Sequence, residues 1–274
     1  MKNPKITLLI SGQFERNLIT NDFLEIIEYH KKIFNFDNVI CHLWNEEYDK
    51  IKHLQIPDHI TIINDEDSLP FNENLMPFIS KEEHTFHAES VLISQKQVET
   101  HDVDSMMPAA FSSLKQLYAM SKIYDYALEN SNSDIYIRSR YDNHYVCSPN
   151  YNELNQYLNS SRPTVFVPRT HINYSLLDHC YIMNKSALEN FKDYFNTCRN
   201  YSFNDRVFWA ENCFRFHANN AKKFILYRFN FPCTVQRWFK NVGHYNSINF
   251  QFTKITRDVK PFKANGIRSA DYIL

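Results

Sequence analysis

The chain has 274 residues, enough for one large α/β domain with a sizeable core, and its 43% hydrophobic and 22% charged residues exclude the disordered and fibrous classes. A formal net charge of -1 lacks the basic excess that binding to a nucleic-acid backbone requires, so we expect no nucleic-acid partner. The chain's 3 glycines lie too far apart for a glycine-rich phosphate loop, so any nucleotide must be held differently.

The first elements along the chain alternate between strand and helix. Residues 6–10 (ITLLI) form a continuous apolar, β-branched run that predicts a buried parallel strand, which ends in the turn Ser11-Gly12. Apolar residues then recur at helical spacing over 23–34, and Asn21 or Asp22 is placed to cap that helix. With further strands expected at 38–44 and 59–64, the order favours an open parallel sheet covered by helices.

The N-terminal apolar run of about five residues is also too short for a secretion signal or a membrane span. None of the 6 cysteines forms a CxxC pair, so we expect them to be reduced packing residues. Both features favour a cytoplasmic protein with at most peripheral membrane association.

The middle of the chain is irregular at first and then strongly helical. Residues from about 65 to 107 show no sustained period, so we expect an irregular segment there. Apolar residues form one helical stripe over 112–128, and a strand is expected at 134–138, with polar residues at its exit.

Later elements are expected in the order helix, strand, strand, helix, helix, strand, with Ser186 capping the first helix after the two strands. Their predicted bounds are 151–158, 164–167, 179–183, 186–194, 208–219 and 223–229, before a tail from 238 that we interpret as a lid or an acceptor-side segment. No repeat or linker divides the chain, so a single domain over 1–274 is expected.

The stretch that carries the most chemical information is DIYIRSRYDN, residues 134–143. Ligands of open α/β sheets bind at the carboxyl ends of strands, and Arg138, Arg140 and Asp142 share one parity there, so all three point one way if the strand persists that far. Guanidinium groups suit the oxygens of a diphosphate, and Asp142 could bind a hard divalent cation, Mn²⁺ or Mg²⁺, that bridges those oxygens. The alternative is an ion-paired strand end with no ligand.

The run from Gln116 to IRSRYDN resembles the bacterial glycosyltransferases of lipopolysaccharide and capsule clusters, the WavE-like group. Those chains also open with a strand and an SGQ-R type turn, here residues 11–13 with Arg16. Further matches are Asp178, which opens a strand before a helix, and Glu211, which starts a late helix. The motifs are short and the resemblance spans roughly residues 6–232, without a full DxD motif, so metal dependence stays open.

The resemblance implies a GT-A-like, Rossmann-like fold with a mostly parallel sheet flanked by helices, a nucleotide-sugar donor, and a glycan or lipid-linked glycan acceptor such as a surface polysaccharide. Residues 1–145 then form mainly the nucleotide-sugar side and residues 146–274 mainly the acceptor side. The residues expected near the donor are Ser11, Gly12, Gln13 and Arg16 at the nucleotide, Gln116 at its base or ribose, and Lys122, Arg138 and Arg140 at its phosphates.

An inverting transferase needs a carboxylate that takes the proton of the acceptor hydroxyl. The candidates are Asp178, Glu211 and Asp205, with Asp178 first because it opens an apparent strand beside the expected cleft. Asp205 can instead be a helix N-cap. Two other functions stay open: a non-catalytic glycan-binding or assembly protein of the same fold, and a nucleotidyltransferase-like enzyme that binds a triphosphate.

Overall fold

The structure is a computed structural model of the chain. The residues that it describes are 4–17, 20–66, 103–145, 148–168, 179–199, 210, 213–214, 217, 224–229, 233–235 and 268–269. The predicted tail from 238 lies outside these residues except for 268–269, as does most of the helix expected at 208–219.

The first part of the chain forms an alternating series of strands and helices. Its elements are β1 (Ile6–Ile10), the short 3₁₀ helix η1 (Phe14–Arg16), α1 (Phe23–Phe34), β2 (Asn38–Trp44), α2 (Asn45–Ile51), β3 (Ile60–Asp65), α4 (Val103–Asn130) and β4 (Ile135–Ser139). The elements that follow are β5 (Asn143–Tyr145), α5 (Tyr151–Leu158), β6 (Thr164–Pro168), β7 (Tyr181–Asn184), α6 (Lys185–Glu189), α7 (Tyr194–Arg199), β8 (Ile225–Phe229), β9 (Cys233–Val235) and β10 (Arg268–Ser269).

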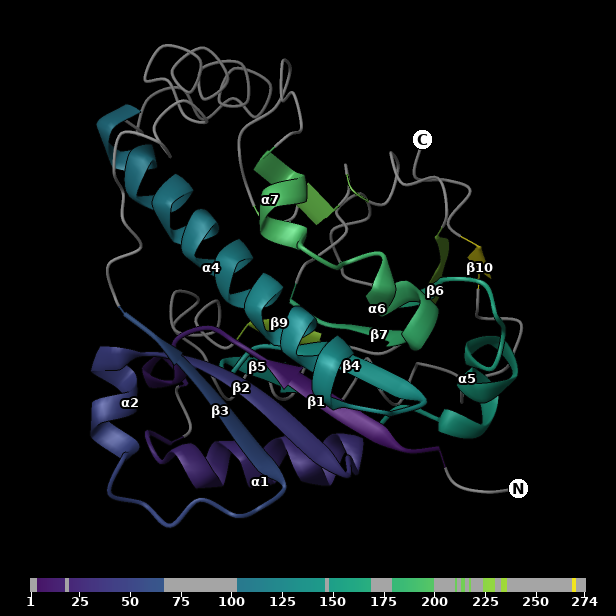
Figure 1. The fold of residues 1–274 in the computed structure, drawn as a ribbon, viewed down its shortest axis with the longest axis horizontal. Coiled ribbons are helices and arrows are strands. Elements are labelled where there is room, and N and C mark those ends of the chain that lie inside the picture. The colour runs from purple at the N-terminus through teal and green to yellow at the C-terminus, as the bar shows by residue number, and fades with distance from the viewer. Residues whose placement is uncertain are drawn as a thin grey trace, which may run out of the picture.

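An 8-stranded sheet in the order β10-β8-β6-β7-β4-β1-β2-β3 forms the centre of the molecule (Figure 1). Its strands run in one direction except β7 and β10, which pair antiparallel with their neighbours. A second sheet contains β5 and β9, which also pair antiparallel. The predicted α/β class, with a mostly parallel sheet flanked by helices, is confirmed.

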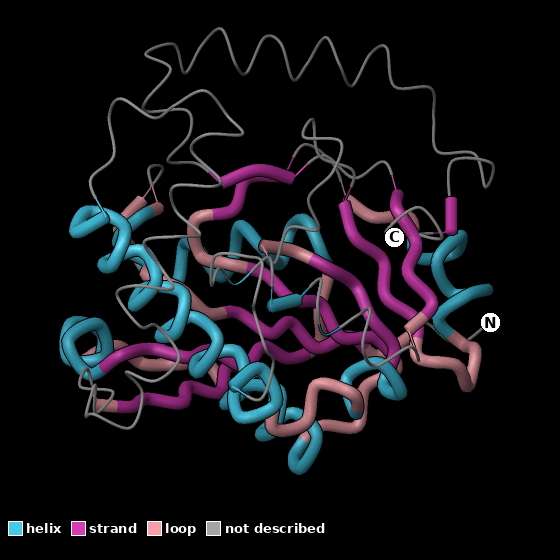
Figure 2. The backbone as a smooth tube through the Cα atoms, turned by 90° about the horizontal axis from the view of Figure 1, so that it is seen from above, coloured by secondary structure: helices cyan, strands magenta, loops and turns pink. Residues whose placement is uncertain are grey.

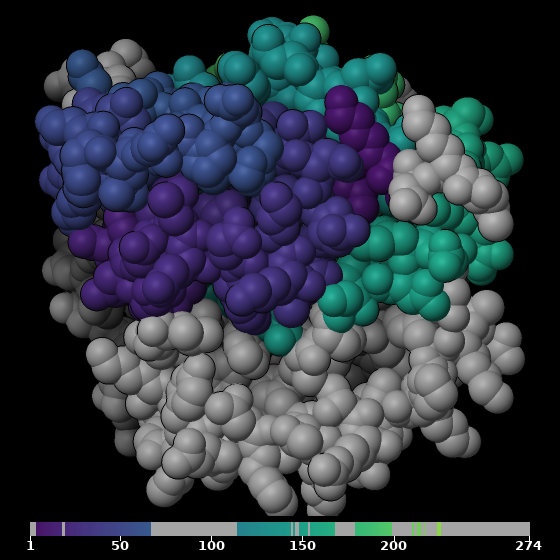
Figure 3. Space-filling model, turned by 90° about the horizontal axis from the view of Figure 1, so that it is seen from below, coloured from purple at the N-terminus to yellow at the C-terminus, as the bar shows by residue number. Residues whose placement is uncertain are grey.

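Helices bury both faces of the central strands, in keeping with β1, whose five residues are all buried. One face packs against α1, α2 and α5, and the other packs against α4, α6 and α7. Figure 2 shows the twisted strands between these helices, and in Figure 3 the purple and blue N-terminal elements lie beside the teal middle of the chain. Two apolar cores therefore hold the sheet from opposite sides.

Asp22 caps α1, as predicted, because its carboxylate accepts from the backbone N–H groups of Leu24 and Glu25. The cap expected at Ser186 is wrong. Asn184 caps α6 instead, with its side-chain oxygen 3.0 Å from the backbone nitrogen of Ala187, and this helix ends at Glu189.

The backbone of Asp193 has a positive φ of 52°, which interrupts the helical stretch before α7 begins at Tyr194. The irregular segment expected at 65–107 is also wrong at its end, because α4 already begins at Val103. Amphipathic periodicity is weak in that first part of α4, which explains why the pattern did not extend so far. Among the described helices, none combines the length and apolarity that crossing a membrane requires.

Two buried histidines make the stability of the fold depend on pH. Burial lowers the pKa of His30 and that of His217 to about 4, against hydrogen bonds to backbone carbonyls of Ile26, Arg140 and Asn190 that favour the proton. Below the ordinary pKa of 6.5 the unfolded chain binds protons that the native protein cannot accept until about pH 4. Their contribution to stability is therefore complete above pH 6.5 and is lost as the pH falls toward 4.

We predict that each histidine accounts for on the order of 2 kcal/mol of the stability lost between pH 7 and pH 5. His30→Gln should lower the free energy of unfolding at pH 7, because it removes packing, but should reduce the loss between the two pH values. Urea unfolding at both pH values measures this difference, with the exposed His53→Gln as the control. An unchanged pH dependence in His30→Gln would show that His30 titrates alike in the native and unfolded states and does not contribute to the loss.

Candidate functional site

The carboxyl ends of β1 and β4 lie side by side, and the candidate site is built there. Leu9 pairs with Arg138 and Ile10 with Ser139 in the parallel register, and the Ser11 backbone nitrogen lies 3.4 Å from the Ser139 carbonyl oxygen. Gly12 follows with φ of 126°, a backbone conformation that residues with a Cβ rarely adopt. The chain can therefore turn sharply out of β1 directly beside the residues that leave β4.

Arg138 is the last residue but one of β4, and its guanidinium has no hydrogen-bond partner among the residues that the structure describes. Alternation along the strand places it on the α4 side, because Tyr136 packs in the core with α4 and Ile137 in the opposite core. Its side chain is fully buried, with 0% exposure, and none of its three guanidinium nitrogens makes a hydrogen bond in the described structure. The hydroxyl of Ser11, also buried at the end of the neighbouring strand, is likewise unpartnered.

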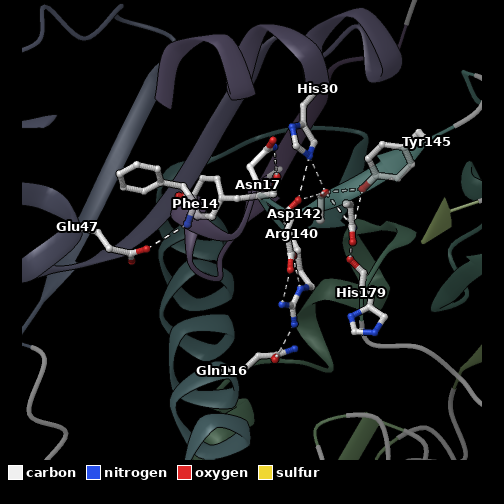
Figure 4. Close-up of polar contacts among 12 residues, drawn as sticks. Phe14, Asn17, His30, Glu47, Gln116, Arg140, Asp142, Tyr145 and His179 are labelled. Atoms are coloured by element: carbon white, nitrogen blue, oxygen red, sulfur yellow. Dashed lines mark hydrogen bonds and ion pairs between the residues drawn. The ribbon is translucent and has the colours of Figure 1, made fainter. Parts of the chain in front are cut away.

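Arg140 and Asp142 form a buried, two-point ion pair. The strand ends at Ser139, so the extended run that would have aligned these residues does not persist. Even so, the Arg140 Nε atom lies 2.8 Å from Asp142 Oδ1, and its Nη2 atom lies 3.1 Å from Oδ2. The third nitrogen, Nη1, donates to Gln116 Oε1 of α4 at 3.1 Å (Figure 4). The positive charge of Arg140 is therefore balanced by Asp142, whereas Arg138 has no hydrogen-bonded counter-charge within the described part of the chain.

A chain of hydrogen bonds holds the segment after β4 against α1 (Figure 4). The side-chain amide of Asn143 donates to the Tyr145 hydroxyl at 2.8 Å, and that hydroxyl bonds the Ser139 hydroxyl. Ser139 in turn contacts His30 Nε2 at 3.1 Å, while His30 Nδ1 lies 2.8 Å from the Ile26 carbonyl oxygen. In the neutral ring, Nδ1 donates to the Ile26 carbonyl and Nε2 accepts from Ser139. The Arg140 carbonyl, 3.0 Å from Nε2, receives a hydrogen bond only when the ring is protonated, which is why that contact favours the proton. All these side chains are buried, and a buried network of bonded polar groups makes the segment after β4 rigid.

Two amide contacts connect this segment to its neighbours. Asn143 also donates to the backbone carbonyl of His179 at 2.8 Å, so the residues that precede β7 are held at the carboxyl end of β4. Asn17, directly after η1, donates to the Tyr141 carbonyl at 2.9 Å and joins the turn after β1 to the turn after β4. The two turns therefore form one connected unit.

Glu47 supports the first turn from α2. Its carboxylate accepts from the backbone N–H of Phe14 at 3.1 Å, and its second oxygen is buried without a hydrogen-bond partner in the described structure. Burial raises the pKa of Glu47 to about 7, although backbone donors oppose the shift. A carboxyl that titrates near neutral pH thus lies beside the predicted nucleotide turn.

The structure brings Ser11, Gly12, Gln116, Arg138, Arg140 and Asp142 together. Gln13 is exposed and Arg16 is half-buried in η1, next to the same turn. Lys122 lies elsewhere along α4, with its ammonium group 5.1 Å from the Tyr118 ring centroid. The three proposed bases, Asp178, Asp205 and Glu211, lie outside the described residues.

Sequence reasoning missed His30, Asn143, Tyr145 and Glu47. One signal was available: His30 occupies a core position in the apolar stripe of its helix, where a polar ring needs a buried partner. No pattern in the sequence marks the other three, because each also contacts a distant part of the chain: Asn143 contacts His179, Tyr145 contacts Phe34, and Glu47 contacts Phe14.

A divalent cation does not fit Asp142 in this arrangement. Both carboxylate oxygens accept from Arg140, so a cation there would share the carboxylate with a buried guanidinium of like charge. Within the part of the chain that the structure describes, no three histidine, cysteine, aspartate or glutamate side chains gather in a way that could hold a metal ion. The Mn²⁺ or Mg²⁺ expected at Asp142 therefore stays a prediction that this geometry does not favour.

No protein-family model and no curated protein matches the chain, so neither adds to the resemblance to the WavE-like group. Similar solved structures include a Bacillus anthracis protein assigned as a glucose-1-phosphate thymidylyltransferase, with a TM-score of 0.43, 8% identity, and coverage of 95% of this chain and 98% of that one. Another is 4-diphosphocytidyl-2C-methyl-D-erythritol synthase from Anaerococcus prevotii, with a TM-score of 0.41, 9% identity, and coverage of 82% and 89%. The mannosyltransferase Ktr4p from S. cerevisiae has a TM-score of 0.40, 13% identity, and coverage of 76% and 62%. At these values the matches carry no argument about activity.

We predict that Arg140→Met destabilises the protein by about 3–5 kcal/mol, because it leaves the buried carboxylate of Asp142 without its counter-charge. The double variant Arg140→Met with Asp142→Leu should recover most of that loss, since it removes both charges. Urea unfolding of the two single variants and the double variant gives the coupling energy. A single variant as stable as the wild type would mean that the ion pair does not hold this turn.

Proposed function

We propose that the protein is a nucleotide-sugar-dependent glycosyltransferase that binds the diphosphate of its donor at the carboxyl ends of β1 and β4. The unpartnered guanidinium of Arg138 is the observation that carries this proposal. A buried charge without a counter-charge costs several kcal/mol, so the arrangement is complete only when an anion joins it. The substrate would supply that anion.

A diphosphate suits this position for chemical reasons. The planar fork of a guanidinium matches two phosphate oxygens, and the buried Ser11 hydroxyl is a second donor at the adjoining strand end. When the sugar leaves, negative charge develops on the diphosphate, and a fixed cation in a buried site stabilises that charge strongly. Arg138 would therefore favour both donor binding and departure of the leaving group.

The remaining roles follow the sequence resemblance. Ser11, Gly12, Gln13 and Arg16 would line the nucleotide, with Gln116 and Arg140 beside them and Lys122 farther along α4. The acceptor would be a glycan or lipid-linked glycan of a bacterial surface polysaccharide, and residues 146–274 would form most of its side. A cytoplasmic location fits a nucleotide-sugar donor.

Asp178 remains our proposal for the base, ahead of Glu211 and Asp205. It directly precedes His179, whose backbone carbonyl is bound by Asn143 in the turn that contains Asp142. The first candidate base is thus the sequence neighbour of a residue, His179, that contacts the site.

We predict opposite effects of Arg138→Met on stability and on binding. The variant removes an uncompensated buried charge while keeping a long side chain, so the melting temperature should stay equal or rise. Its affinity for the nucleoside diphosphate that the wild type binds, out of UDP, GDP, CDP and dTDP, should fall by about 10-fold or more. Thermal melts and isothermal titration measure the two effects.

Arg140→Met is the matched control, because it removes a paired guanidinium and should lower the melting temperature instead. If Arg138→Met binds the nucleoside diphosphate as the wild type does, Arg138 is not a donor ligand. If the wild type prefers triphosphates to diphosphates, the nucleotidyltransferase alternative replaces our proposal, and a protein that binds only glycans would support the non-catalytic alternative.

For the base, we predict that Asp178→Asn lowers single-turnover transfer by about 10²–10⁴-fold, because the acceptor hydroxyl loses its proton acceptor. Donor affinity should stay nearly unchanged, since the substitution keeps the size of the side chain. Glu211→Gln and Asp205→Asn, tested in the same assay, should show milder losses. A near-normal rate in Asp178→Asn together with a slow Glu211→Gln would transfer the role to Glu211.

A further inference from the structure

Asp142, the carboxylate beside the proposed diphosphate position, already forms an ion pair with an arginine of the protein. Mg²⁺ and Mn²⁺ are held in nucleotide sites by carboxylates that share the metal with the substrate's phosphate oxygens. Asp142 is the carboxylate at the exit of β4, and each of its oxygens accepts from a different nitrogen of Arg140, at 2.8 and 3.1 Å. The place where a bridging metal would bind is thus next to a guanidinium.

Further contacts and burial hold this ion pair together. Arg140 is held on its other side by Gln116 of α4, and both members of the pair are buried. To bind a metal ion, Asp142 would have to leave a two-point hydrogen-bonded contact or bring the metal close to Arg140. Either change is unfavourable, because the repulsion between the two cations is strong in a buried site.

The positive charge that a metal would supply is present in the protein. Arg138 lies one strand position before Ser139, on the α4 side of the sheet that also holds the Arg140 contact. Within the described residues, none of its guanidinium nitrogens has a hydrogen-bond partner. A guanidinium binds two phosphate oxygens through parallel hydrogen bonds and needs no proton exchange to stay charged. One arginine can thus neutralise the diphosphate while the other orients the turn.

We propose that this site binds the nucleoside diphosphate without a divalent cation, with Arg138 as the counter-charge and with Asp142 as a positioning residue that holds Arg140. The inference rests on the proposed function, because it concerns the same ligand. It differs from that function in a property that can be measured separately, the dependence of binding on metal.

The test is isothermal titration of the full chain, freed of metal, with UDP, GDP, CDP and dTDP, each in EDTA and in Mn²⁺ or Mg²⁺. For the nucleotide that binds, we expect dissociation constants within about threefold of each other in the two conditions. Arg138→Met should weaken binding by about 10-fold or more in both conditions. Asp142→Asn keeps the size of the side chain and one acceptor oxygen, and its dissociation constants should likewise be equal with and without the metal.

Four results would overturn the inference. Binding that disappears in EDTA and returns with Mn²⁺ would do so while leaving the glycosyltransferase proposal intact. Restored binding of Arg138→Met on addition of Mn²⁺, or loss of a metal effect only in Asp142→Asn, would place a metal at Asp142. If no nucleoside diphosphate binds in either condition, the proposed function fails and this inference fails with it. Melting temperatures of all variants show which ones are folded, and the wild-type comparison decides the question without any variant.

Discussion

The hydrogen-bond chain from Asn143 through Tyr145 and Ser139 to His30 constrains the whole candidate site. β4 lies in the middle of the sheet, and the segment that follows it remains inside the protein rather than reaching the surface. Polar groups buried in this way need protein partners, and this chain of side chains supplies them. Because His30 belongs to α1 and Asn143 also binds the carbonyl of His179, the same contacts fix the positions of α1 and β7 relative to the site.

Two arginines two residues apart have opposite electrostatic environments. Arg140 is paired with Asp142 and Gln116, so its charge serves the structure. Arg138 is buried, and its guanidinium has no hydrogen-bonded partner in the part of the chain that the structure describes, so its donors are available to an anion. Stability given up at a binding site is a common consequence of preorganisation, since a cation that is already fixed and desolvated needs no rearrangement when the ligand arrives.

The reversed direction of β7 brings a distant part of the chain to the site. Because β7 pairs antiparallel with β4, with Tyr181 opposite Arg138, its N-terminal end lies at the carboxyl end of β4. If β7 ran parallel to β4, His179 would lie at the amino end of β4 instead of its carboxyl end. The strand direction therefore decides whether Asp178, next to His179 in the sequence, can be considered as a base at all.

The amino-acid sequence by itself determined the α/β class, most strands and helices, and the residues Arg138, Arg140 and Asp142 as the chemically informative group. These features are local: continuous apolar runs, helical periodicity and strand-end charges are visible within a few residues. Only the tertiary structure decided that Asp142 pairs with Arg140, because the strand stops at Ser139 and Gln116 approaches from α4. It also decided that the Arg138 guanidinium has no hydrogen-bond partner among the described residues. It also decided the direction of β7 and the roles of His30 and Glu47. Partner choice among buried charges depends on which groups the packed chain brings within about 3 Å, and no local pattern contains that information.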